Sequence, residues 1–376
     1  MSRRNLASIV DHFSELEDPR VQRTRWHPLI NVVVIGLCAV ICGARHFTEM
    51  EEFGNSKRDW LAKFLDLRHG IPSHDTFNQV FCRLQPQQFE KCLLSWITAL
   101  CELTGGLIRP IDGKTLRGSY DRGDGRAAIH MVSVWAAENH LSLGSVVVPE
   151  KSNEITAIPR LLELIDVSGT LVTIDAMGCQ KEIAQKILDE AADYVLAVKD
   201  NQPTLHATIR AFFATHLEND FADSSCRRYE TQDKDPGRTE QRSYYLAPVP
   251  QDFVLRREWA GLKALGMAMT ISQRDERETC EVRYYILSKY VSGRRFAEAV
   301  RGHWGIENNL HWQLDVTFRE DELRIRKGHA PANMSILMRT ALSLLKNEDS
   351  NRRGLATKRL IAGWDEDYLE KVITGT

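Results

Sequence analysis

Two short apolar stretches of this chain each run directly into an aspartate. Residues 107–111 precede Asp112, and residues 171–174 precede Asp175. Each stretch predicts a β-strand that ends by presenting a carboxylate, and a glycine interrupts the pattern soon afterwards. A single aspartate at a strand end is usually a turn former or a helix N-cap. The pair therefore suggests a shared site only if a third acid joins it, and Glu307 in VRGHWGIENNLHWQLD is the candidate.

The composition is that of an ordinary soluble protein with a large core. The chain has 376 residues, of which 43% are hydrophobic and 27% are charged. This length is enough for two or three domains, and the composition excludes a disordered or fibrous chain. Lys and Arg number 49 against 51 Asp and Glu, for a net charge of -2. Binding to nucleic acid would therefore depend on local clusters of cations.

Cysteine spacing and the N-terminus favour the cytoplasm. The eight cysteines contain no C-x-x-C pair, so neither a zinc site nor a disulfide framework is expected. No apolar segment follows the two arginines near the N-terminus, which argues against an export signal. The most apolar stretch, residues 29–44, contains Asn31 and is shorter than the roughly 18 residues of a membrane span. We therefore expect a buried helix there.

Residues 1–104 predict an all-helical N-terminal domain. Four stretches predict helices, which are residues 29–44, 56–67, 76–84 and 89–103, and apolar residues recur at helical spacing in residues 56–67. The turn RHGIPSHD precedes the third stretch, and Ser73 or Asp75 can cap the helix that follows. Such a helix-turn-helix can read DNA, although the commoner explanation is packing. Residues 104–106 predict a hinge into the Asp112 strand.

Residues 105–215 predict the first part of an α/β core. Besides the two aspartate-ending stretches, strand-like runs occur at residues 129–136, 141–148 and 194–198, and helix-like runs at residues 153–165 and 180–192. Pro159 is expected in the first turn of its helix. The loop at residues 120–128 has the wrong spacing for a calcium loop and predicts a hairpin connection. The order β-β-β-α-β-α-β predicts a mixed sheet covered by helices, with ligands at the strand ends.

Residues 216–290 predict a β-rich insertion. The segment is rich in charge at first and then strand-like at residues 244–246, 265–271 and 280–287. We expect an inserted antiparallel unit, and the alternative is that these strands simply complete the sheet.

Residues 291–376 predict a long helix and then a helical, basic tail. The long helix begins at Arg294 or Phe296 and ends near Val316, and a further amphipathic helix follows at residues 332–346. The tail contains a basic group formed by Arg352, Arg353, Lys358 and Arg359. This tail and the N-terminal helices are both candidates for reading DNA ends.

Four polar residues recur every four positions along the long helix. They are His303, Glu307, His311 and Asp315. This spacing predicts one slowly drifting stripe on a face of the helix. A polar stripe is most often solvated, but Trp304 and Trp312 flank this one, and two indoles are unusual on an ordinary solvent face.

Two aspartates and a glutamate that converge would need cations between them, because bare carboxylates repel one another. Hard oxygen ligands favour Mg²⁺ or Mn²⁺ over Zn²⁺. Two such ions, roughly 3.5–4 Å apart, activate an attacking oxygen and stabilise the leaving oxygen of a phosphodiester. The pattern therefore predicts phosphoryl transfer, with bases stacked on the two tryptophans. The expected phosphate contacts are Lys114 and Arg117, in a glycine-flanked basic turn after Asp112, with Lys199 and Arg301.

Several long motifs resemble the DDE-type transposases of bacterial insertion sequences, and within them the group of H-repeat-associated proteins. The motifs are IDGKTLRGS, VTIDAMGCQKEIA, DYVLAVKDNQP and FAEAVRGHWGIENNLHWQLDVTFRED with RIRKG, and the similarity covers essentially the whole chain. The resemblance implies an RNase H-like mixed sheet flanked by helices, with the β-rich insertion before the final catalytic helix. It also implies that Asp112, Asp175 and Glu307 are the catalytic and metal-binding acids.

The chain departs from this family pattern in two places. Where many relatives have Tyr, Arg and Lys around the glutamate, this sequence has Val300, His303 and Leu314. We therefore expect phosphate contacts from Arg301, His303 and His311 instead. In KDNQP, Asp200 stands where Gly is expected in close relatives, and it predicts an ion pair with Lys199. The cations of FREDELRIRKGHAP bind DNA or form a salt-bridged surface, and they include Arg324, Arg326 and Lys327.

The resemblance implies a Mg²⁺- or Mn²⁺-dependent DNA transposase of the bacterial cytoplasm and nucleoid. It would bind the terminal inverted repeats of its element and the target DNA as a homo-oligomer, cleave the element ends and transfer them. Two alternatives stay open at this point. One is a structure-selective nuclease that cuts but never joins strands, and the other is a DNA-binding remnant without activity.

Overall fold

The computed structural model describes residues 9–100, 108–120, 127–138, 140–148, 154–222, 224–235, 238–274 and 277–375. The chain forms two compact units. Unit 1 contains residues 1–105, 113–151 and 307–376, and unit 2 contains residues 106–112 and 152–306. The predicted hinge at residues 104–106 lies outside the described residues, as does most of the predicted hairpin loop, residues 121–126.

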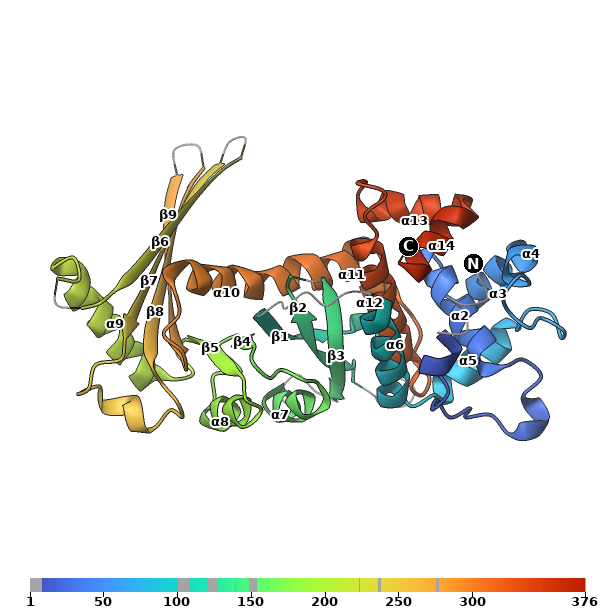
Figure 1. Ribbon diagram of the computed structural model, residues 1–376, viewed down its shortest axis with the longest axis horizontal. Coiled ribbons are helices and arrows are strands. Elements are labelled where there is room, and N and C mark those ends of the chain that lie inside the picture. The colour runs from blue at the N-terminus through green and yellow to red at the C-terminus, as the bar shows by residue number, and fades with distance from the viewer. Residues whose placement is uncertain are drawn as a thin grey trace. The chain divides into compact units, whose positions relative to one another are not determined.

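Helices make up the N-terminal part of unit 1, as the sequence predicted. They are η1 (Gln22–Thr24), α2 (Leu29–Ile41), α3 (Phe47–Ser56), α4 (Arg58–Leu61), α5 (His74–Arg83) and α6 (Pro86–Leu100) (Figure 1). The hydroxyl of Ser73 caps α5 by accepting a hydrogen bond from the backbone N–H of Thr76 at 3.4 Å. Whether this helix pair reads DNA stays a prediction.

Helix α2 is the buried helix that its apolar sequence predicted. All of its residues from Asn31 onward are buried. The amide of Asn31 donates a hydrogen bond to the backbone carbonyl of Asp66 at 2.7 Å, which explains how a polar residue is tolerated there. Among the helices that the structure describes, none is long and apolar enough to cross a bilayer.

Helix α12 (Ala330–Asn347) packs against α2, α5, α6 and β3 in unit 1. Every residue from its start to Leu345 is buried. The prediction of an amphipathic helix was therefore wrong, because this stretch has no solvent-facing side. Even its polar Asn333 has partners inside the unit, and its amide donates to the backbone carbonyl of Phe81 at 2.8 Å.

The C-terminal tail of unit 1 forms α13 (Leu355–Trp364) and α14 (Glu366–Thr374). Lys358 and Arg359 are buried and do not belong to a basic surface. Lys358 donates to the backbone carbonyl of Leu345 at 2.9 Å, and Arg359 donates to that of Val40 at 2.9 Å. These cations thus satisfy carbonyls near the C-terminal ends of α12 and α2. The predicted basic group is wrong for these two residues, whereas Arg352 and Arg353 are exposed.

Strand β1 (Ile108–Thr115) belongs to both units, because the chain passes from unit 2 to unit 1 after Asp112. The glycine-flanked turn predicted directly after Asp112 was wrong, since the strand continues to Thr115. In unit 1, β2 (His130–Ala136) lies beside β1 and pairs antiparallel with β3 (Leu141–Val148). This arrangement confirms the predicted meander.

Unit 2 contains a parallel arrangement built from β1, β4 (Leu171–Ile174) and β5 (Asp193–Val198). Helices α7 (Glu154–Leu164) and α8 (Lys181–Asp189) alternate with these strands along the chain, so the predicted order is confirmed. Pro159 lies in the interior of α7 and not in its first turn. Helix α9 (Pro203–Glu218), with Pro203 at its start, was not predicted.

The remaining strands of unit 2 extend the same sheet. They are β6 (Arg227–Asp235), β7 (Arg238–Pro248), β8 (Ala264–Arg274) and β9 (Arg277–Leu287), with η4 (Val254–Arg257) between β7 and β8. The strand order in unit 2 is β1-β4-β5-β9-β8-β7-β6. Strand β9 pairs antiparallel with β5, with Val195 opposite Leu287 and Val198 opposite Tyr284. The alternative in which these strands complete the sheet is therefore correct, and a separate inserted unit is not.

Helices α9 and α10 (Gly293–Ile306) lie on opposite sides of this extension (Figure 1). Successive tyrosines of β9 show the reason, because neighbouring side chains of a strand face opposite ways. Tyr284 stacks on Phe213 of α9, with ring centroids 6.2 Å apart. Tyr285 meets Phe296 of α10 edge to face at 5.4 Å. The chain continues through the π-helical segment η5 (Glu307–His311), α11 (Trp312–Val316) and η6 (Glu320–Glu322).

Candidate active site

The two predicted aspartates follow directly on an aligned pair of residues in unit 2. Strands β1 and β4 run parallel, and Ile111 lies opposite Ile174 in their register. The next residue along the chain is the aspartate in each case, so Asp112, which lies inside β1, and Asp175, which directly follows β4, occupy the same level of adjacent strands. Parallel neighbours are about 4.8 Å apart. The sequence prediction that both carboxylates gather at one strand-end edge is thus consistent with the strand register.

Asp175 also forms a turn, which was the ordinary explanation for such a residue. Its Oδ1 accepts hydrogen bonds from the backbone N–H groups of Met177 at 3.0 Å and Gly178 at 3.2 Å. No donor among the described residues binds its Oδ2. A side chain on Gly178 would place its Cβ 2.3 Å from the Ile174 side chain, so glycine is required for this close turn. One oxygen therefore fixes the carboxylate, and the other stays available.

His303 lies beside this edge of unit 2 but does not serve as a cation. Its Nδ1 is 3.3 Å from the hydroxyl of Thr173 in β4. Burial lowers the pKa of His303, and the nearby carboxylate of Asp175 only partly opposes that effect. The ring is therefore neutral at pH 7. His303 therefore adds no positive charge at this edge, and its predicted phosphate contact stays a prediction.

Glu307 begins unit 1's last segment and is exposed. It is the first residue of η5, where the helix adopts π geometry. A π turn has a different angular step from an α-helix, so a stripe at constant four-residue spacing does not continue through it. Among the residues that the structure describes, no three His, Cys, Asp or Glu side chains form a group that could hold a metal ion. The convergence of Glu307 with the aspartates stays a prediction.

The donor chemistry of the two aspartates suits Mg²⁺ or Mn²⁺. Both ions prefer carboxylate oxygens, and Asp175 keeps an oxygen without a described hydrogen-bond donor. Buried Cys179 lies four residues after Asp175, and burial raises the pKa of its thiol to about 12. It stays protonated at neutral pH and adds no soft thiolate ligand.

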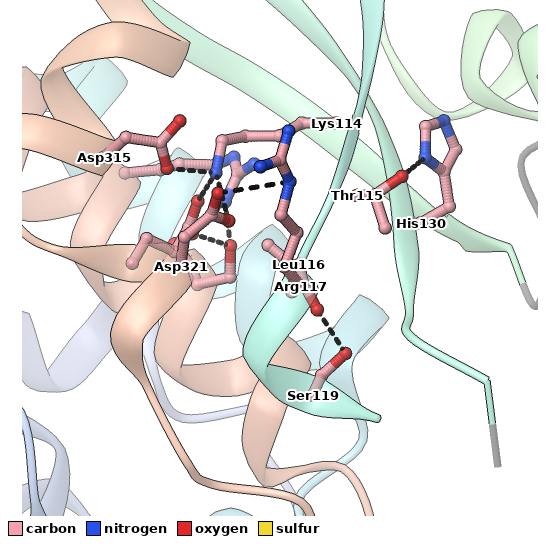
Figure 2. Close-up of polar contacts among 11 residues, drawn as sticks. Lys114, Thr115, Leu116, Arg117, Ser119, His130, Asp315 and Asp321 are labelled. Atoms are coloured by element: carbon pink, nitrogen blue, oxygen red, sulfur yellow. Dashed lines mark hydrogen bonds and ion pairs between the residues drawn. The ribbon is translucent and has the colours of Figure 1, made fainter. Parts of the chain in front are cut away.

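Lys114 has a different role from the predicted phosphate contact. Its side chain is only 8% exposed. Its ammonium lies 2.6 Å from Asp315, 2.8 Å from Glu320 and 3.4 Å from Asp321, all in unit 1 (Figure 2). Coulombic attraction from these carboxylates outweighs burial and raises the pKa of Lys114. The prediction was wrong for this residue, because three acids already occupy the ammonium.

The same cluster contains a buried glutamate with cations on both of its oxygens. Glu320 is 1% exposed at its side chain, and Arg339 donates to its second oxygen at 3.0 Å. Ser335 also donates to that oxygen. Burial alone would raise the pKa of Glu320, but Arg339 and Lys114 together hold it below its usual value. Glu320 belongs to the motif FREDELRIRKGHAP, for which a salt-bridged surface was one expectation. No local sequence pattern indicated that Glu320 is buried.

His311 is a second predicted phosphate contact that carries no positive charge at neutral pH. Burial lowers its pKa to about 3, and the positive charges of Arg339 and Lys114 act in the same direction. The ring is neutral at any pH above that value.

The other predicted DNA contacts are accessible. Arg117 is 82% exposed and only 3.5 Å from Asp321, and Lys199 is exposed. Asp200 lies 3.4 Å from Nδ1 of His206, and among the described residues it forms no ion pair with Lys199, contrary to the prediction. Arg301 is half-exposed and 3.4 Å from Asp233.

Trp304 and Trp312 are 39% and 53% exposed. The guanidinium of Arg283 stacks on the Trp304 ring at 3.9 Å. A cation on one indole face leaves base stacking possible only on the other, so this role stays a prediction. Arg324 and Lys327 are exposed, whereas Arg326 lies over the Tyr120 ring at 4.7 Å.

The fold is that of an α/β protein with a mixed sheet, and comparisons with known proteins identify its family. The chain belongs to the DDE transposases: residues 104–344 match the family described as "Transposase DDE domain", and residues 10–97 match "DDE_Tnp_1-associated". This confirms the resemblance seen in the motifs.

Two full-length relatives are similar to the chain. It is 41% identical to the protein named "Putative transposase YncI" of Escherichia coli O157:H7, over 98% of this chain and 95% of that protein. It is 37% identical to "H repeat-associated putative transposase YhhI" of Escherichia coli K12, over 99% of each. A solved structure of the piggyBac transposase synaptic complex with hairpin DNA matches 98% of this chain and 79% of that chain, at 11% identity and a TM-score of 0.43.

Replacing Lys114 by Met should destabilise the protein strongly. The substitution keeps the apolar stem but leaves buried Glu320 with one cation and Asp315 with none, and breaking a buried ion pair costs about 3–5 kcal/mol. Urea denaturation of Lys114→Met measures this change. Arg117→Met is the matched control, because the exposed guanidinium lies near the same Asp321 and should contribute less than about 1 kcal/mol. Equal effects of the two substitutions would contradict the assigned role of Lys114.

His311 should make stability fall as the pH drops below neutral. The unfolded ring takes up a proton near pH 6.5, whereas the folded ring does so only near pH 3. Between these values the unfolded state binds more protons, so acid favours unfolding by about 2 kcal/mol at pH 5. The difference in unfolding free energy between pH 7 and pH 5 should shrink by that amount in His311→Asn. An unchanged difference would show that the folded ring titrates normally.

Proposed function

We propose that this chain is a divalent-metal-dependent DNA transposase that cleaves phosphodiesters at the ends of an insertion sequence and joins the freed ends to target DNA. The observation that carries this proposal is the register of β1 and β4, in which Ile111 lies opposite Ile174 and Asp112 and Asp175 are the residues that follow. Membership of the DDE transposase family supports it. We also propose that the α/β sheet is an RNase H-like core.

In the proposed reaction, the acids hold the metal and the cations hold the DNA. Asp112 and Asp175 would provide carboxylate oxygens, and Glu307 would complete the set. When bound, Mg²⁺ or Mn²⁺ supplies activation of the attacking oxygen and stabilisation of the leaving oxygen. Asp175 is suited to this role because its turn fixes one oxygen and leaves the other accessible.

The chemistry consists of two successive displacements at phosphorus. In the first, a water oxygen forms a bond to phosphorus at the element end, and the bond to the 3′ oxygen breaks and leaves a 3′-hydroxyl. In the second, that hydroxyl attacks a phosphodiester of the target and displaces its 3′ oxygen. Both steps need the same acids, because each has one attacking and one leaving oxygen.

The DNA substrates we propose are the terminal inverted repeats and a target duplex, bound by a homo-oligomer. Phosphate contacts are assigned to accessible cations, since surface charge rather than net charge determines such binding. Arg117 and Lys199 meet this condition, as do half-exposed Arg301 and the pair Arg324 and Lys327. Lys114, His303 and His311 are left out because their charge is neutralised or absent.

Asp175→Asn should abolish strand cleavage while leaving DNA binding largely intact. Losing a carboxylate ligand removes several kcal/mol of transition-state stabilisation, so we expect cleavage to fall about 1,000-fold or more. Cleavage of an end-containing duplex and a gel-shift assay measure the two properties. Asp166→Asn is the matched control, because Asp166 is an exposed aspartate of unit 2 whose Oδ1 also accepts a turn N–H, from Ser168 at 2.9 Å. A cleavage rate near that of the unsubstituted protein would remove the assignment.

A metal-exchange experiment separates a ligand from a structural aspartate. Asp175→Cys should be inactive with Mg²⁺ and partly active with Mn²⁺, because the thiolate prefers the softer ion. A strand-transfer assay with a precleaved end then tests joining. Cleavage without joining would favour a nuclease, and neither activity would favour a DNA-binding remnant.

A further inference from the structure

The π-helical segment η5 carries Glu307 and needs support from the rest of unit 1. A π turn departs from regular helical hydrogen bonding, and such turns are rare and concentrate at functional sites. Within η5, Glu307 and Asn308 are exposed, whereas Leu310 is fully buried. Whatever fixes this turn therefore determines where Glu307 is presented.

Lys346, in the last turn of α12, contacts this segment directly. Its ammonium donates a hydrogen bond to Oδ1 of Asn309 at 2.8 Å. The same ammonium lies 5.4 Å from the ring centroid of Trp135, which is fully buried in β2. Lys346 thus connects η5 with the most buried helix and with the sheet of unit 1.

The surroundings of Lys346 disfavour a charged side chain. Among the described residues, no carboxylate lies within ion-pairing distance of Lys346, so an amide oxygen and an indole face are its described partners. Burial lowers the pKa of Lys346 to about 8, which reflects the penalty on the charged form. A charged lysine without a described carboxylate partner at this position is explained by the contact of its ammonium with Asn309.

We propose that Lys346 is a positioning residue of the active site, whose ammonium holds Asn309 and thereby fixes the π turn that presents Glu307. The inference rests on the proposed function, since it assigns Lys346 to the same acidic site. The contact with Asn309 is the reason for preferring it over a simple interaction with the C-terminal dipole of α12. A lysine acting only on the dipole would turn toward the last carbonyls of its own helix.

The test compares Lys346→Met, Asn309→Leu and the double variant with the unsubstituted chain. Lys371→Met is the matched control, because Lys371 is also in the last turn of a helix, α14, but is exposed. Three properties are measured: hydrogen exchange of the backbone amides of residues 307–311 without DNA or metal, the urea midpoint, and cleavage of an end-containing duplex.

Lys346→Met should speed amide exchange in residues 307–311 about five-fold, as expected for losing one hydrogen bond. Cleavage should fall about 10- to 100-fold, the usual effect of removing a partner that orients a metal ligand. The urea midpoint should change little, because the loss of one hydrogen bond is offset by the removal of a half-buried charge that has no described carboxylate partner. The double variant should be no worse than either single variant, since both break the same contact. Lys346→Arg, which keeps a charged donor, should restore most of the cleavage.

Two results would overturn the inference. The first is that Lys346→Met and Lys371→Met show the same amide exchange in residues 307–311 and the same cleavage. This would show that the Lys346 ammonium does not hold the π turn. The second is that Lys346→Met lowers the urea midpoint and that protection from exchange and cleavage fall in proportion. This would show that Lys346 only stabilises the fold. If the unsubstituted chain cleaves no DNA with any metal, the proposed function fails, whereas amide exchange and the double-variant comparison still decide whether Lys346 holds the π turn.

Discussion

The buried ion cluster around Glu320 is the interaction on which unit 1 depends. Lys114 binds one oxygen of this carboxylate and Arg339 binds the other, so the end of β1, η6 and α12 meet at a single charged group. Removing either cation leaves buried Glu320 with a single partner, and breaking a buried ion pair costs more than the intact pair contributes. Alternative packings of α12 would separate Arg339 from Glu320 and would carry the same penalty.

Some cations of the basic motifs are buried, which explains why these motifs predicted the DNA-binding surface only in part. Lys114 lies in IDGKTLRGS and Arg359 in the basic tail, and both were expected on a DNA-binding surface. In the structure Lys114 neutralises acids more than 200 residues away in sequence, and Arg359 satisfies carbonyls of α2. A sequence shows a positive charge but not its partner, so long-range pairing of this kind cannot be read locally. Charges that stay accessible, such as Arg117, are the ones for which a DNA role remains.

The strands that the sequence predicted best are those whose apolar residues form uninterrupted runs. The stretches before Asp112 and Asp175 lie in the parallel part of the sheet and are buried on both faces. Such strands are nearly continuous apolar runs, which indicate a strand in the sequence. Strand β6 is different, because its residues are charged along most of its length. Arg242 of β7 pairs with Asp233 across this hairpin, so ionic contacts replace apolar ones. A strand of that composition resembles a loop until its partner is known.

The surroundings of Glu307, the proposed catalytic glutamate, could not be predicted from periodicity alone. A constant four-residue spacing joins His303 to Glu307 and His311, but the π turn that begins at Glu307 changes the angular step between residues. The two histidines are half-buried and neutral at pH 7, while Glu307 is exposed. A regular α-helix with the same sequence would carry Glu307 at a different angle relative to Leu310, whose burial anchors the segment. Local departure from ideal helix geometry is therefore what makes an exposed acid and a buried anchor compatible within one turn.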